Sequence, residues 1–230
     1  MHATTCAVDL AKNVFQLAFA DADWKPCGTQ RLTRARFSHC FDNSATSLVV
    51  MEACGSAHHW ARQISAQGIE VRLLPAHYVR RYRVRNKTDA ADAAALLEAA
   101  RCADIQPVQI KSVEQQALQS LHRARALWMR DRIRQINALR GFCREFGVYV
   151  AQGARLGLEQ MGRSLADPRS TLPELLRPTM RTMLEDIRLL EVRISQLEKQ
   201  LTEVAKQSAT CTRLMSIPGV GLLTATAMVA

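Results

Sequence analysis

Four acidic residues lie in sequence contexts that favour metal chemistry. Asp9 interrupts the apolar run "CAVDL", and Glu52 ends the apolar run "SLVVME". A carboxylate on an otherwise buried strand costs several kcal/mol unless it is paired or bound to a cation. Asp89 and Asp92 are three residues apart in the alanine-rich stretch 86–100, so on a helix they share one face. Together the four acids offer the oxygen ligands that Mg²⁺ prefers.

This set of carboxylates predicts a site for two Mg²⁺ ions, with Mn²⁺ as the alternative ion. Two such ions bind the attacking and leaving oxygens of a phosphodiester during displacement. Each acid also has a structural interpretation. A strand-end acid commonly faces solvent, and acids near a helix start are stabilised by the macrodipole, with Thr88 or Asp89 as the N-cap.

An α/β domain is predicted to position these acids. Residues 4–23 read as two strands joined by a turn near Lys12 and Asn13, and residues 47–52 and 69–75 as two more strands. Residues 56–68 read as a helix that Gly68 closes. The alternation of strands and helices predicts a mixed sheet in a domain that ends near Pro107.

The second half of the chain is predicted to be helical. Residues 112–147 have a helical pattern, and a stretch containing glycine and proline follows at 153–178. Apolar residues then recur three and four positions apart, at Met180, Met183, Ile187, Leu190, Ile194, Leu197, Leu201 and Val204. This register predicts a coiled coil, formed either by folding back on the first long helix or between subunits.

The final stretch, "LMSIPGVGLLTATAMVA", predicts a tight turn followed by a helix. It resembles a helix-hairpin-helix turn, in which Gly219 and Gly221 let backbone N–H groups approach a phosphate. A plain helix–helix turn is the alternative. Because the apolar helix reaches Ala230 without a charged last turn or a glycine cap, we expect the chain to be cut short.

The net charge of +10 predicts a polyanionic partner, with nucleic acid as the first candidate and a membrane surface as its rival. No apolar run is long enough to span a bilayer, and Asp9 and Lys12 interrupt the segment where a signal peptide would have its apolar core. We therefore expect a cytoplasmic protein that associates with the nucleoid when bound to DNA, without a membrane partner.

Residues 77–87, "HYVRRYRVRNK", form a basic segment without an acid. Its candidate nucleic-acid-binding residues are Arg80, Arg81, Arg83, Arg85, Lys87 and Tyr82. Arginine binds phosphates bidentately and tyrosine stacks on unpaired bases. Since the segment leads directly into Asp89 and Asp92, we expect it to hold a nucleic-acid backbone beside the metal ions. A solvated loop is the alternative.

Three segments in order, "AVDLAKN", "VVMEACGSAHHWA" and "NKTDAADAAALLEAA", resemble the N-terminal domain of the DEDD transposases of the insertion sequence 110 and 1111 family. The resemblance implies a ribonuclease-H-like, RuvC-like catalytic domain at residues 1–108. A helical coiled-coil segment would follow at 109–208, and a C-terminal transposase domain would begin at 209–230. It also implies that Asp9, Glu52, Asp89 and Asp92 are the metal-binding catalytic acids.

The implied activity is metal-dependent cleavage and transfer of DNA strands during transposition. The resemblance further implies a structured guide RNA from the element. We also expect a homo-oligomer joined through the coiled coil, because two ends must be handled together. The family's second domain supplies a serine thought to be a nucleophile, and no residue here matches it. The alternative function is therefore a catalytically incomplete fragment that binds nucleic acid or dimerises.

Overall fold

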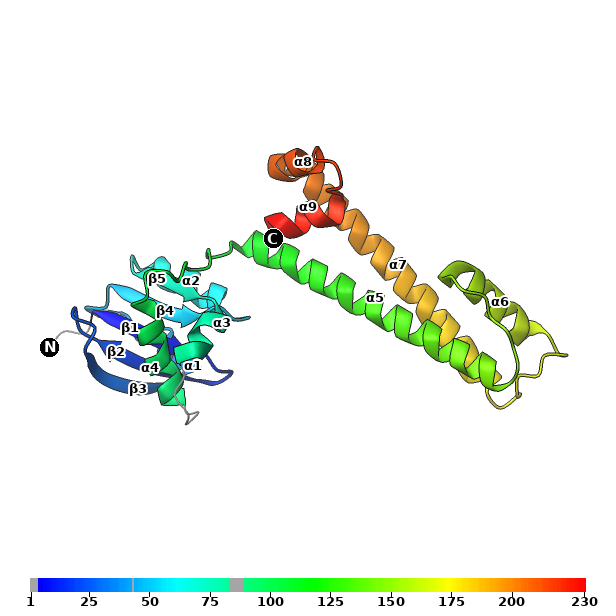
Figure 1. Cartoon of the computed structure of the whole chain (residues 1–230), viewed down its shortest axis with the longest axis horizontal. Helices are drawn as coiled ribbons and strands as arrows, with labels where there is room; N and C mark the ends of the chain where they lie inside the picture. The colour runs from blue at the N-terminus through cyan, green and yellow to red at the C-terminus, as the bar shows by residue number, and fades with distance from the viewer. Residues whose placement is uncertain (1–3, 43, 83–88) are drawn as a thin grey trace. The chain divides into compact units, whose positions relative to one another are not determined.

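The structure is a computed structural model that describes residues 4–42, 44–82 and 89–230, without the side chains of residues 89 and 90. The chain forms two compact units, Met1–Ser112 and Val113–Ala230. Figure 1 shows the sheet in the first unit and the long helices in the second.

The first unit contains a five-stranded mixed sheet. Its strands are β1 (Thr5–Asp9), β2 (Val14–Ala20), β3 (Pro26–Thr33), β4 (Leu48–Glu52) and β5 (Glu70–Leu74), in the order β3-β2-β1-β4-β5. The pairs β1–β4 and β4–β5 are parallel, whereas β1–β2 and β2–β3 are antiparallel. The predicted α/β domain with a mixed sheet is confirmed.

Helices cover both faces of this sheet. Along β1, Cys6 and Val8 belong to the core beneath α1 (Arg34–Phe37) and α2 (Ala57–Ser65), while Ala7 belongs to the opposite core. That opposite core contains residues of α3 (Ala76–Val79) and α4 (Asp89–Ala100). The period of two in a strand thus assigns alternate side chains to two separate cores.

The end of the first unit is fastened to its sheet and to α2. The N–H of Val108 donates to the carbonyl of Leu73 at 2.7 Å. The N–H of Lys111 donates to His58 Nδ1 at 3.2 Å, and the Arg62 guanidinium donates to the Lys111 carbonyl. His58 is buried and holds the backbone here.

In the second unit, α5 (Val113–Glu145) pairs with α7 (Arg177–Gln207). The predicted coiled-coil stripe therefore folds back on the first long helix of the same chain. Six of its eight predicted positions are buried, but Val204 is 37% exposed and Ala205 is buried instead. The short helices α8 (Ala209–Met215) and α9 (Leu222–Val229) pack against this pair.

The connection between α5 and α7 contains a helix that the sequence did not predict, α6 (Ala154–Ala166). It buries Met161 and Leu165 against the long helices. Arg177 is only 4% exposed, and its side chain orders the loop after α6 by donating to backbone carbonyls, including those of Leu165 and Ser170. In the part of the chain that the structure describes, no helix is long and apolar enough to cross a bilayer.

Candidate functional site

The sheet brings Asp9 and Glu52 together. Asp9 ends β1 and Glu52 ends the adjacent parallel strand β4, and both are half-buried. Val8 pairs with Met51, so the same register continued by one residue sets Asp9 opposite Glu52. Because Val8 and Met51 face the α1–α2 side, alternation directs both acids to the face covered by α4.

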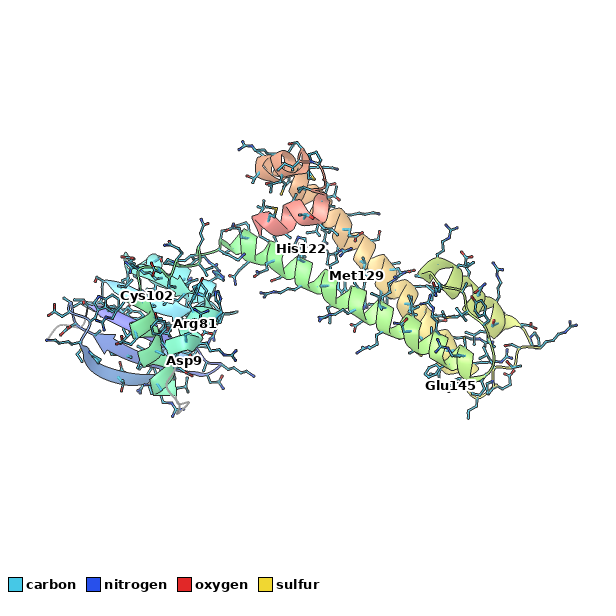
Figure 2. All side chains as sticks on the ribbon, in the orientation of Figure 1. Asp9, Arg81, Cys102, His122, Met129 and Glu145 are labelled. Carbon is cyan, nitrogen blue, oxygen red and sulfur yellow. The ribbon has the colours of Figure 1, made fainter. Side chains whose placement is uncertain are left out.

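Asp92 lies on the buried side of α4. It is 8% exposed and precedes Leu96, which is in the core, by about one helical turn. The helix packs on β1, β2 and β4, the strands that carry or flank Asp9 and Glu52. Figure 2 labels Asp9 beside this helix. Asp89 is the first residue of α4, and its side chain lies outside the described residues.

Three of the four predicted acids therefore belong to one face of the sheet. Their potential ligand atoms are carboxylate oxygens carried on strands and a helix, which suits Mg²⁺ or Mn²⁺. Among the side chains that the structure describes, which exclude that of Asp89, no three His, Cys, Asp or Glu groups are close enough to hold a metal ion. The structure thus places the two strand acids at the ends of adjacent strands and puts Asp92 on the helix that covers their face.

The described part of the basic segment is the end of α3, where Val79 is buried, followed by a turn at the surface. Arg80, Arg81 and Tyr82 form the 3₁₀ helix η1 (Arg80–Tyr82) and are all exposed. The guanidinium of Arg81 lies 5.7 Å from the centre of the Tyr78 ring, a cation–π distance. A hydrogen bond with the Cys102 thiol raises the pKa of Tyr82. The remaining predicted residues, Arg83, Arg85 and Lys87, lie outside the described residues.

The glycine-containing turn joins α8 to α9. Gly219 has a φ of 87°, a left-handed conformation that favours glycine, whereas Gly221 has an extended backbone and serves as the N-cap residue of α9. Its carbonyl accepts from the N–H of Ala225 at 2.9 Å. Only the first of the two glycines is therefore required by backbone conformation, and a phosphate contact at the turn stays a prediction.

None of the functional residues predicted from the sequence is an arginine of α5. The helix has seven, and Arg123, Arg130 and Arg144 fall on a seven-residue spacing. That spacing was a signal in the sequence, because residues seven apart lie on one side of a helix.

A family model described as a transposase, for the DEDD transposases of IS110, matches residues 6–147. The chain belongs to this transposase family. Its match includes all four predicted acids and the basic segment.

Relatives that match almost all of this chain agree with its membership of the family. A protein named a probable family 20 transposase, from Pseudomonas aeruginosa, is 35% identical over 100% of this chain and 68% of its own length. The transposase for insertion sequence element IS1111A, from Coxiella burnetii, is 37% identical over 95% of this chain and 60% of its own length. The chain thus spans roughly two thirds of these transposases. No solved structure matches it.

Proposed function

We propose that this transposase-family chain cleaves and transfers DNA strands by metal-dependent phosphodiester chemistry, with Asp9, Glu52, Asp89 and Asp92 as ligands of two Mg²⁺ or Mn²⁺ ions. The observation that carries the proposal is the arrangement of Asp9 and Glu52 on adjacent strand ends, under the helix that buries Asp92. The mixed sheet with helices on both faces supports a ribonuclease-H-like, RuvC-like domain.

The chain's own groups have separate roles in this proposal. Bound divalent ions would supply Lewis-acid stabilisation of the attacking and leaving oxygens. The carboxylates fix where those ions bind, since the two strand ends are held by the sheet's hydrogen bonds. Arg80 and Arg81, on the exposed η1 turn before α4, hold the DNA backbone and offset its repulsion by the acids. Tyr82 and the glycines of the α8–α9 turn add further nucleic-acid contacts.

The proposed partners are DNA, a structured guide RNA from the element and further copies of this chain. For the homo-oligomer, two of the apolar side chains that α7 leaves exposed, Leu189 and Val192, offer contact surface, because α5 occupies the predicted coiled-coil stripe. The chain spans only about two thirds of the length of its relatives. We therefore state complete transposition by this chain as part of the proposal.

The Asp92→Asn variant tests the metal site. We expect it to lower Mg²⁺-dependent or Mn²⁺-dependent cleavage of branched DNA by at least about 100-fold, because even second-sphere changes at metal sites cost about 10–100-fold. Its DNA affinity should change less than about twofold. Glu98→Gln is the matched control, because Glu98 is an exposed acid on the same helix that pairs with Arg101 at 3.2 Å.

Titration calorimetry with Mn²⁺ tests the loss of a ligand directly, and the unchanged DNA affinity of Asp92→Asn shows that the variant is still folded. Weaker Mn²⁺ binding in Asp92→Asn and unchanged binding in Glu98→Gln support the assignment. If Asp92→Asn cleaves as fast as the unaltered chain, the assignment is wrong. DNA binding with no cleavage by the unaltered chain would favour the alternative, a nucleic-acid-binding or dimerising fragment of a transposase.

A further inference from the structure

The arginines of α5 divide into an inner and an outer set. The inner set joins α5 to its neighbours: Arg125 pairs with Glu198 at 2.7 Å, and Arg132 pairs with Glu191. Arg140 donates to backbone carbonyls of the loop before α6. These three side chains have structural partners that account for them.

The outer set has no comparable structural role. It consists of Arg123, Arg130, Arg134 and Arg144, all exposed, and we call it the outer arginine face. Among the described residues, no acid forms an ion pair with Arg123, Arg130 or Arg144. Arg134 pairs with Asp131 at 3.1 Å, but its side chain is 79% exposed, and such surface pairs contribute little.

The two long helices differ in charge. α5 contains seven arginines, no lysine and three acids, whereas α7 contains six basic residues and five acids. Solubility alone does not explain the excess of arginine over acidic residues on α5, because a mixture of positive and negative charges makes a helix surface equally soluble. The exclusive use of arginine also matters, because its planar fork binds phosphate oxygens bidentately and lysine does not.

The dimensions of the face fit duplex DNA. Arg123 and Arg144 are 21 residues apart on one continuous helix, which corresponds to about 32 Å at 1.5 Å per residue. One turn of duplex DNA is about 34–36 Å long. A straight row of guanidinium groups of this length can therefore reach phosphates over about one turn.

We propose that the outer arginine face binds the phosphate backbone of duplex DNA without reading its sequence. The proposal rests on the proposed function, in which DNA is the substrate, and adds a binding surface in the second unit that is separate from the four acids. A protein partner on this face would cover the exposed Leu127, which lies between Arg123 and Arg130, and would bury their guanidinium groups. Buried guanidinium groups need acidic partners, so a protein partner is disfavoured.

Salt dependence of DNA binding by the full chain tests the proposal. The probe is a fluorescent DNA duplex of about 30 base pairs, roughly three helical turns, titrated between about 50 and 200 mM salt. The variant is Arg123→Gln/Arg130→Gln/Arg144→Gln. We expect the slope of log K against log salt to fall in magnitude by about 2.7, since each lost phosphate contact removes about 0.9.

The matched control removes the same charge from the exposed side of α7 with Arg188→Gln/Arg193→Gln/Lys199→Gln. Its slope should change by less than about 1. Glutamine has nearly the same helix propensity as arginine, so both triple variants should keep the helical circular dichroism of the unaltered chain.

Three results would overturn the proposal: an unchanged slope in the α5 variant, an equal loss in the α7 control, or a loss seen with duplex RNA or an acidic polypeptide but not with duplex DNA. The result is independent of the metal site. If Asp92→Asn cleaved normally while the α5 slope fell as expected, the proposed catalytic acids would be wrong and the outer arginine face would stand.

Discussion

At the scale of single residues, His122 links the ionisation of one side chain to the packing of α9. Its Nε2 lies 3.0 Å from Thr226 Oγ1, and the Thr226 hydroxyl donates to the Leu222 carbonyl at 2.8 Å. The imidazole N–H therefore donates to Thr226, which leaves Nδ1 as the site that gains a proton. Burial, and then the positive charge of Arg125, lower the pKa of His122 below 6.5.

This lowered pKa predicts a loss of stability in acid. A group whose folded pKa is depressed below its unfolded pKa binds fewer protons in the folded state, so its contribution is complete above about pH 6.5 and declines as the pH falls. Urea unfolding at about pH 7.5 and about pH 5.5 measures the effect. The decrease should be smaller in His122→Gln, which keeps an N–H donor, than in the unaltered chain. Equal decreases in both would show that His122 does not contribute.

The acids themselves were identifiable from the sequence only as candidates. Asp9 and Glu52 stand out in the sequence because they interrupt or end apolar runs. Their adjacency depends on β1 pairing with β4, which is distant along the chain, and local sequence does not determine strand order. The burial of Asp92 likewise depends on which side of α4 faces the sheet.

At the scale of elements, the pairing of α5 with α7 makes a clear prediction about packing. Leu201 is 0% exposed in the core that α7 shares with α5, whereas Val204, three residues later, is 37% exposed. Leu201→Ala should reduce the free energy of unfolding by about 2–5 kcal/mol, because it removes buried methyl groups and leaves a cavity.

Val204→Ala provides the control on the same turn of the helix. Its effect should be within about 0.5 kcal/mol, as is usual for surface substitutions. Chemical denaturation monitored by circular dichroism gives both values. Similar losses in the two variants would contradict the assignment of Leu201 to the core and Val204 to the surface.

Most elements were predictable because their apolar patterns are strong. β1, β2, β4 and β5 contain the apolar runs that marked them, and the seven-residue pattern of α7 indicated a paired helix. β3 was missed because, as an edge strand, it buries only Leu32. α6 was missed because Gly157 and Gly162 weaken a helical pattern that tertiary contacts restore.

At the scale of the whole molecule, the proposals assign cleavage to one compact unit and part of the DNA binding to the other. The α5 triple variant should therefore raise the DNA concentration needed for half-maximal cleavage while leaving the rate at saturating DNA within about twofold, because lost uniform binding raises KM alone. Asp92→Asn should do the reverse. Single-turnover cleavage over a range of DNA concentrations separates the two effects.

One result would contradict this separation of DNA binding from cleavage. If the α5 variant lowered the saturated rate as strongly as Asp92→Asn, then its arginines would be needed for the chemical step and not for binding alone.

The division into two units was only partly visible in the sequence, which suggested a boundary near Pro107 from the change in pattern. The contacts of Val108 and Lys111 with the first unit fix its last residues, and those contacts have no sequence signature.

The return of α7 along α5 also has a consequence during synthesis of the chain. Leu118 packs with Leu197 and Leu201, which are translated about 80 residues later. At about 5–20 residues per second, the apolar side of the nascent helix waits roughly 4–16 s for its partner. A ribosome-bound chaperone that recognises apolar helices would have time to engage this segment before the hairpin closes.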